Sequence, residues 1–460
     1  MAQPPSLTVS RGRSTVARER SASVSTLEKF GWGLLMFWLT GPWYLLLSGA
    51  NPSGANLLNS VSPLYSYISD VVPLIPLAVL IYDRNRALAL LRRCWPFAAF
   101  LLLTMLLLVT AQDVKLCILR FWGYLGTVFA VLGVFTRLSP KQALRCLAYM
   151  LAASFVLNIL TVFLLPRYGI TGGTDVYGAS SSGEWRGLYN HKNVLGQFCG
   201  VSFGVLVVTG RDLLRPTALW LVSLALALLC IYKASSSTGL VLAAILPGIY
   251  YGLLWPRGVF RVLGGIAVAI GCTAILLLRG VVVDSVLRAL GKGETLSGRT
   301  DIWHVAREFA GQYPITGAGY DYSNSAEMTA RFFKLFNVPN AHNAYLDALI
   351  NLGWIDTAVL GAAVIGALVA AWSRRLPEQL EGVRNALTLF LAAWLISGTD
   401  EVMAMKPLGA LPLFGAVAII GLYNLKRYGE RIGAPARASS AASSRSRSRS
   451  RRVDQGVANA

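Results

Sequence analysis

Long apolar blocks recur along this chain, and they constrain its fold more than any other feature. Most of them run for about 17 to 25 residues, the length that a helix needs to cross the hydrocarbon core of a bilayer. The blocks at 143–165 and 259–278 contain a single charged residue each, whereas a soluble amphipathic helix carries charges every few positions. Hydrophobic residues make up 55% of the chain and charged residues only 14%. The sequence therefore predicts a polytopic membrane protein.

The apolar blocks predict an all-α bundle of about 12 transmembrane helices, with a large extracytoplasmic loop between the ninth and tenth spans. This plan gives a basic N-terminal tail at 1–29, a transmembrane domain at 30–423 and a disordered basic tail at 424–460. The first tail shows no apolar segment ending at a small-residue cleavage site, so we expect no removable signal peptide. The expected spans are 30–49, 64–82, 94–110, 116–135, 143–165, 188–209, 217–232, 239–255, 259–278, 343–372, 383–397 and 407–423.

The net charge of +20 follows from where the basic residues lie. They concentrate in both tails and in alternate short loops, for example at Arg84 and Arg137, while the opposite short connections hold only Lys115, Lys233 and Lys406. This asymmetry follows the positive-inside rule and predicts that both tails are cytoplasmic. It accounts for the charge without nucleic-acid binding, which we do not expect. The SSRSRSRSRR repeat of the C-terminal tail is expected to be a solvated anchor or to contact anionic membrane lipid.

The cysteine and histidine patterns predict no metal site. Six cysteines are scattered singly in or beside the spans, without the CxxC pairing of thiolate metal sites or a disulfide framework. We expect them to pack as small apolar residues. The chain also lacks an HxxxH or HExxH pattern and a cluster of aspartates, so no metal-ligand set is predicted.

Two extracytoplasmic segments, 166–187 and 279–342, are longer than a connection requires, and binding groups concentrate in such loops. In the second, residues 300–313 place apolar side chains at helical spacing and should form an amphipathic helix that Pro314 closes. The GAGYD sequence that follows predicts a turn, because no strand precedes it and the pattern is too weak for a phosphate loop.

Polar groups gather where the first of these loops enters a span. Arg186, His191, Lys192 and Asn193 lie within WRGLYNHKNVLGQ. A single basic residue near a span end can simply extend its charge to the membrane interface, but four polar groups within eight residues favour a binding role.

Other cations stand near the outer ends of the spans. Arg299 precedes the amphipathic helix, where its guanidinium could grip a phosphate beside the helix-starting amides or could pair with Asp301. Lys115, Arg120 and Lys233 are expected mainly to extend their charges to the interface.

His342 is the best candidate for a general base. It lies in NAHNAYLDALINLGWIDTAVLG at the expected start of a span, and histidine, whose intrinsic pKa is near neutrality, can accept a proton from a hydroxyl, which Asn340 and Asn343 cannot do. A hydrogen-bonded interfacial histidine without a chemical role is the alternative, and that alternative is preferred for His304. One base and several cations at the outer face of a membrane bundle suit the transfer of a group from a phosphate-bearing lipid.

Four stretches resemble the O-antigen ligase family, which includes the polymerases of O-antigen and exopolysaccharide repeat units. They are RGLYNHKNVLGQ, SSSTGLVLA, SGRTDIWHVAREFAGQYPITGAGY and AHNAYLDALINLGWIDTAVL, in the order of the family. The resemblance covers about residues 150 to 405.

The resemblance implies a multi-pass glycosyltransferase of the bacterial inner membrane that acts at its periplasmic face on undecaprenyl-diphosphate-linked glycans, without metal, sugar nucleotide or other cofactor. It implies that His342 activates the acceptor hydroxyl, with Asn343 beside it, that Arg186 holds the donor diphosphate, and that Arg299 is the basic residue of the SGR segment. Many members place a cation within the serine-rich motif. This chain has SSST there, so we expect Lys233, two residues earlier, to supply the corresponding charge.

Three functions remain open from the sequence. A polymerase of repeat units is preferred over a ligase that passes finished glycan to lipid A core or another acceptor. A flippase and a chain-length regulator of the same pathway would be partners of either enzyme. A transporter is less favoured, because its nearest signal is Asp70 within the second expected span and the two halves of the chain show no convincing repeat.

Overall fold

The computed structural model describes residues 24–47, 63–172, 183–254, 296–336, 338, 340–373, 376–399, 408–425 and 428. Within these ranges the chain is helical, and its only strand-like pairing is one antiparallel bridge between Ile170 and Trp185. The predicted all-α class is therefore confirmed for this part of the chain. The helices are α1 (Thr26–Leu39), α2 (Tyr44–Leu47), α3 (Pro63–Val71), α4 (Leu74–Tyr82), α5 (Arg84–Leu91), α6 (Trp95–Leu107), α7 (Val114–Arg137), α8 (Pro140–Leu164), α9 (Pro166–Gly169), α10 (Lys192–Leu213), α11 (Thr217–Ala234), α12 (Ser237–Ile249), α15 (Leu296–Ala310), α16 (Ala326–Phe336), α17 (Ala344–Trp372), α18 (Glu378–Ser397) and a last helix, Ala410–Leu425.

Six of the described helices are long and apolar enough to cross a membrane: α7, α8, α10, α11, α17 and α18. A seventh span would result if Arg84–Leu91 and Trp95–Thr110, which meet at a bend of 95°, are taken together. Shorter apolar helices cover Tyr67–Tyr82, Ser237–Gly252 and Ala410–Leu425. These findings support a multi-pass helical bundle, while the number twelve stays a prediction. The expected span at 259–278 lies outside the described residues.

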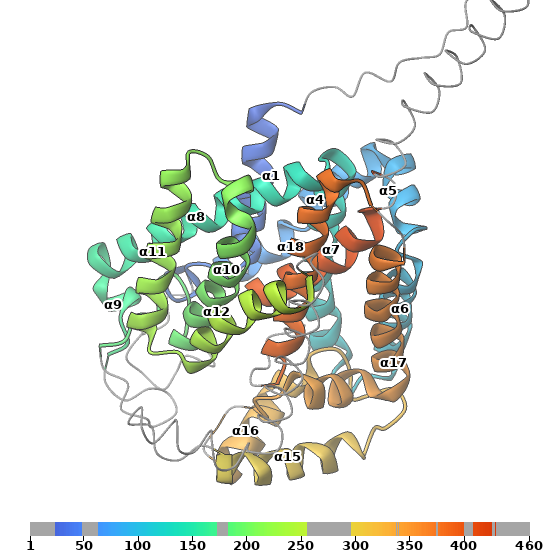
Figure 1. Ribbon diagram of the computed structural model, residues 1–460. Helices are drawn as coiled ribbons and strands as arrows, with labels where there is room; N and C mark the ends of the chain where they lie inside the picture. The colour runs from blue at the N-terminus through green and yellow to red at the C-terminus, as the bar shows by residue number, and fades with distance from the viewer. Residues whose placement is uncertain are drawn as a thin grey trace, which may run out of the picture.

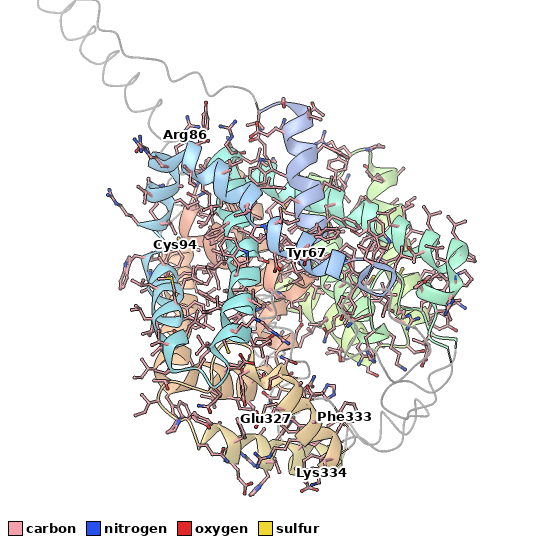
Figure 2. The ribbon with its side chains drawn as sticks, turned by 180° about the vertical axis from the view of Figure 1, so that it is seen from behind. Tyr67, Arg86, Cys94, Glu327, Phe333 and Lys334 are labelled. Carbon is pink, nitrogen blue, oxygen red and sulfur yellow. The ribbon has the colours of Figure 1, made fainter. Side chains whose placement is uncertain are left out.

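The two ends of the bundle differ in chemistry. Arg137 at the end of α7 donates to Glu28 at 2.7 Å and to Asp83 at 2.8 Å, which ties α1, α4 and α7 together. Figure 2 shows Arg86 at this end, which we call the arginine end, and Glu327 and Lys334 at the opposite end, which we call the α16 end. In Figure 1, α15 and α16 lie across the α16 end. The positive-inside rule predicts that the arginine end faces the cytoplasm.

Small residues allow α10 and α12 to approach closely in the centre of the bundle. A Cβ atom on Gly200 would lie 2.2 Å from the carbonyl oxygen of Gly239, and one on Gly196 would lie 2.1 Å from the Cβ of Ser236. Only glycine permits this contact between helix backbones, as small residues do in other membrane bundles. Most of α10 is consequently buried, and its first turn is held in a fixed position at the α16 end.

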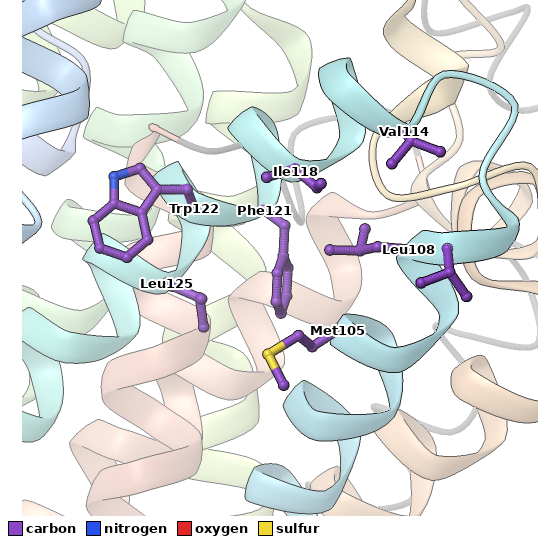
Figure 3. A pocket seen from close by; sticks show the side chains of 8 residues that line it. Met105, Leu108, Val114, Ile118, Phe121, Trp122 and Leu125 are labelled. Carbon is purple, nitrogen blue, oxygen red and sulfur yellow. The ribbon is translucent and has the colours of Figure 1, made fainter.

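An apolar groove runs between α6 and α7 in the half of the bundle near the α16 end. Met105, Leu108, Phe121 and Trp122 are among its walls, and its volume is about 320 Å³ (Figure 3). The walls are almost wholly apolar, so the groove suits the hydrocarbon of the surrounding bilayer.

Helix α17 is broken at Gly353, where φ is +63° and ψ is −172°. In Figure 1 the part before the break runs across the end of the bundle and the part after it runs along the bundle. The N–H groups of Trp354 and Ile355 donate to the carbonyls of Pro314 and Ile315, at 2.8 and 3.4 Å, so the break leaves these groups bonded. The expected span at 343–372 is therefore divided, because the segment 314–319 replaces the helical hydrogen bonds at Gly353.

Candidate active site

The segment that joins α9 to α10 is held against the end of α11. After the bridge from Trp185 to Ile170, the backbone N–H of Trp185 donates to the carbonyl of Lys233 at 2.9 Å. The Nζ of Lys233 lies 6.0 Å from the centre of the Trp185 ring and 5.8 Å from that of Tyr232. Lys233 is exposed, so its charge stands at the surface of the α16 end, as the sequence predicts.

Arg186 follows directly and is buried, with 4% of its surface exposed. Its Nε donates to the carbonyl of Tyr168 at 2.8 Å and its Nη2 to that of Arg167 at 2.9 Å. Two bonds from one planar guanidinium fix the short helix α9 against the segment before α10. Both acceptors are neutral carbonyl groups, and the two bonds hold the guanidinium of Arg186 in place.

The start of α10 gathers three more of the predicted residues. His191 is the N-cap, and its Nδ1 accepts a hydrogen bond from the backbone N–H of Asn193 at 3.1 Å. Lys192 Nζ forms an ion pair with Glu184 at 2.7 Å. We call Arg186, His191, Lys192, Asn193 and Lys233 the α10 cluster. The structure brings them together at the α16 end, where the amide groups of the first turn of α10 add to the positive potential.

The turn before α17 explains why His342 stands between two asparagines. The side chain of Asn340 accepts from the N–H of His342 at 3.1 Å. Asn343 is the N-cap of α17, and its Oδ1 accepts from the N–H groups of Tyr345 and Leu346 at 3.0 and 3.1 Å. These bonds hold His342 in a left-handed conformation, with φ of +49°, which non-glycine residues seldom adopt and which recurs at active sites.

Helices α15, α17 and α18 meet beside this turn. The Nε1 of Trp303 donates to the carbonyl of Ala341 at 3.0 Å, and the N–H of Ala344 donates to the carbonyl of Gly398 at 2.8 Å. The three helices enclose an open pocket of about 340 Å³, which we call the α15 pocket. Its lining residues are Trp303, Arg307, Asn343, Tyr345, Leu346 and Thr399.

Residues 222–361 match the O-antigen ligase family. We call residues 222–361 the family region. The resemblance predicted from the sequence is thereby confirmed. This family region runs from α11 into α17, so it contains Lys233, α15 and the His342 turn, whereas Arg186 lies before it.

The exopolysaccharide production protein ExoQ of Rhizobium meliloti (strain 1021) is similar to this chain, with 25% identity over 289 residues. The match covers 56% of this chain and 66% of the relative, which is just under two thirds of that protein's length. Both comparisons point to glycan assembly, one through the family description and the other through the name of the relative.

The sequence identifies one arginine of α15, Arg299, as a candidate site residue but does not identify a second, Arg307. Arg299 lies in the first turn of α15, which begins at Leu296, and its side chain is outside the described residues. Arg307 is exposed and lines the α15 pocket, although the sequence indicates only that it lies on the polar side of the helix. Its spacing of four residues from Trp303 puts both on one face of α15, and this signal could have identified it.

Arg120, which was expected to extend its charge to the interface, instead pairs with Asp321 of the family region. The expectation was wrong because Asp321, only 4% exposed, requires a cation. Asp321 also accepts from the Nδ2 of Asn324 at 2.7 Å, and the N–H of Gln112 donates to the carbonyl of Ala318 at 2.8 Å. The Arg120 pair therefore anchors the GAGYD turn on α7, and the Gln112 bond ties it to the segment before that helix.

Replacing Arg120 with alanine is therefore expected to destabilise the protein strongly. Loss of one partner from a buried ion pair typically costs about 3 to 5 kcal/mol, because the remaining charge stays buried. The temperature at which detergent-purified protein unfolds should fall clearly for Arg120→Ala. The double variant Arg120→Ala/Asp321→Ala should recover part of the loss. If the double variant were as unstable as the sum of the single variants, the pair would not be coupled.

Proposed function

We propose that this protein polymerises oligosaccharide repeat units carried on undecaprenyl diphosphate at the periplasmic face of the inner membrane. The observation that supports this proposal most directly is the His342 turn, which fixes a candidate base at the end of the bundle that also carries the α10 cluster. Both tails would then lie in the cytoplasm, and the substrate would reach the site from the surrounding lipid. A flippase that delivers the repeat units and a regulator of chain length would be its partners.

In the proposed reaction, His342 accepts the proton of an acceptor hydroxyl on a new repeat unit. The hydroxyl oxygen then forms a bond to the anomeric carbon of the growing chain, and the bond from that carbon to the carrier diphosphate breaks. The electron pair leaves with the diphosphate, which accumulates negative charge. The α10 cluster, together with Arg299, would stabilise this charge. A direct displacement of this kind inverts the anomeric centre, because no covalent nucleophile takes part.

Arg186 offers a test of the donor side. Arg186→Ala should reduce glycan transfer and also loosen α9, since the guanidinium bonds two carbonyls of that helix. Arg186→Lys keeps the positive charge but cannot make both bonds, so it should restore transfer only in part. Transfer rate per folded protein, measured against donor concentration, separates the two effects. Full recovery by lysine would show that a point charge is sufficient and that the two-bond geometry of the guanidinium has no role in transfer.

A ligase uses the same chemistry but passes finished glycan to lipid A core or another acceptor, and the family description favours it. We place polymerisation first because the relative ExoQ is named for exopolysaccharide production. The two functions differ in which product is lost when the gene is deleted. A polymerase mutant makes single repeat units but no long chains, whereas a ligase mutant keeps long chains on the lipid carrier.

The size profile of lipid-linked, surface and secreted glycan in a deletion strain therefore tests the proposal. Complementation with the wild-type gene should restore long chains, and single repeat units should accumulate without it. Long glycan that persists on the carrier in the deletion strain would make the protein a ligase. An unchanged profile in every fraction would remove glycan transfer as its function.

A further inference from the structure

We infer that the α15 pocket is the subsite that holds the terminal sugar ring of the acceptor, the one whose hydroxyl His342 activates. This inference rests on the proposed function and goes beyond it by assigning residues to one of the two substrates. It concerns a site formed by α15, the start of α17 and the end of α18.

The two aromatic walls of the pocket are fixed in orientation. Trp303 is held by its bond to the carbonyl of Ala341, and the Oη of Tyr345 donates to the carbonyl of Leu395 at 2.7 Å. Both side chains therefore offer apolar ring surface while their polar atoms are bonded to the protein. A rigid aromatic face suits a pyranose ring, because the C–H groups on one side of such a ring form a small apolar surface.

The remaining walls offer hydrogen-bond donors and one acceptor suited to hydroxyl groups. The cap of α17 uses the Oδ1 of Asn343, so the Nδ2 group of that side chain can donate toward the pocket. Arg307 is exposed and can also donate, whereas the Oγ1 of Thr399, which donates to the carbonyl of Ile396 at 2.8 Å, can accept from a sugar hydroxyl. A few polar groups among aromatic walls, in a volume of about 340 Å³, resemble small-molecule sites in general, which span roughly 300 to 1,000 Å³. The apolar groove between α6 and α7 lacks such groups and would not bind a sugar.

The position of the pocket favours the acceptor over the carrier diphosphate. Residues on both sides of His342 belong to the pocket or contact it: Trp303 binds the carbonyl of Ala341, and Asn343 is part of the lining. The lining contains one cation, Arg307, whereas the α10 cluster holds Arg186 before α10, Lys192 at the start of α10 and Lys233 near the end of α11. A diphosphate is held better by several cations than by one. The acceptor ring is thus assigned to the α15 pocket and the diphosphate to the α10 cluster.

The test uses the purified full-length protein in detergent and, as probe, the repeat-unit oligosaccharide released from the host's lipid carrier by mild acid. Saturation-transfer NMR should detect the sugar on the wild type. Trp303→Ala and Arg307→Ala should each weaken binding by about tenfold, the loss expected when a stacking face or a charged hydrogen bond is removed. Asn343→Asp keeps the oxygen that caps α17 but loses the donor, so it should also weaken binding while the helix stays formed. Trp354→Ala, which removes a tryptophan that is 64% exposed beyond the break, is the matched control and should bind as the wild type does.

When assayed for transfer, Trp303→Ala, Arg307→Ala and Asn343→Asp should show an increased KM for the acceptor and an unchanged KM for the lipid-linked donor. An absence of sugar binding to the wild type would overturn the inference. So would wild-type binding and wild-type acceptor KM in Trp303→Ala, Arg307→Ala and Asn343→Asp. If His342→Ala retained full transfer while these three variants still lost sugar binding, the proposed base would fail and the subsite would stand.

Discussion

Replacing His342 with alanine is expected to lower glycan transfer by a factor of about 100 to 10,000, which is the usual contribution of a general base. The alanine variant should still fold, because at this turn it is the backbone N–H of residue 342 that donates to the side chain of Asn340. Transfer should be measured with purified protein in vesicles, using lipid-linked repeat units as both donor and acceptor. The pH dependence of transfer should also change, since the proposed proton acceptor is removed.

His304 provides a matched control for this experiment. It lies on α15 at the same end of the bundle, it is 67% exposed, and its Nδ1 stands 3.4 Å from Glu308 within the same helix. His304→Ala should leave transfer unchanged. Near-normal transfer by His342→Ala would end the assignment of the base, and equal losses in both variants would indicate a general effect on the α16 end.

Replacing Gly353 with alanine is expected to prevent correct folding of the α16 end. The φ and ψ angles of Gly353 lie in a region that is open almost only to glycine. This conformation alone costs any other residue about 1 to 3 kcal/mol. A Cβ atom there would also lie 2.4 Å from the carbonyl oxygen of Ile315 and 2.5 Å from the nitrogen of Gly317. Relief of these overlaps would separate α17 from the segment that closes its break. Both the yield of monodisperse protein and its unfolding temperature should fall sharply.

Gly361 lies on the same helix and serves as the control. A Cβ atom at Gly361 would meet no atom within 4 Å, so Gly361→Ala should be neutral or slightly stabilising, because alanine favours helix more than glycine does. Wild-type stability and transfer in Gly353→Ala would mean that α17 can run straight through this position, and the described break would then have no functional importance.

Much of the bundle could be predicted from the sequence, because a membrane span is a local property of about 20 residues. The break at Gly353 could not be predicted in this way. The hydropathy of the run around LINLGWID is that of an ordinary span, and the groups that satisfy the break are the carbonyls of Pro314 and Ile315, far earlier in the chain. Only the fold reveals that glycine is required there for its positive φ.

The candidate site was predictable as a set of residue types but not as an arrangement. His342 and Arg186 could be identified as a possible base and a possible cation, since such groups are costly near a membrane. The bonds from Arg186 to α9, the pairing of Arg120 with Asp321 and the α15 pocket depend on contacts between residues distant in sequence. For that reason these contacts could be found only in the structure.

The way in which the break of α17 is closed also bears on biogenesis. Each backbone N–H left unsatisfied in hydrocarbon costs several kcal/mol, roughly as much as a marginal protein's whole stability. Trp354 and Ile355 obtain their acceptors from the segment 314–319, which lies outside the helix. We therefore expect the second half of α17 to be stable in the bilayer only when that segment is in place. The bonds that close the break thus join the start of the second half of α17 to a segment about forty residues earlier in the chain, so the helix and that segment are expected to settle together.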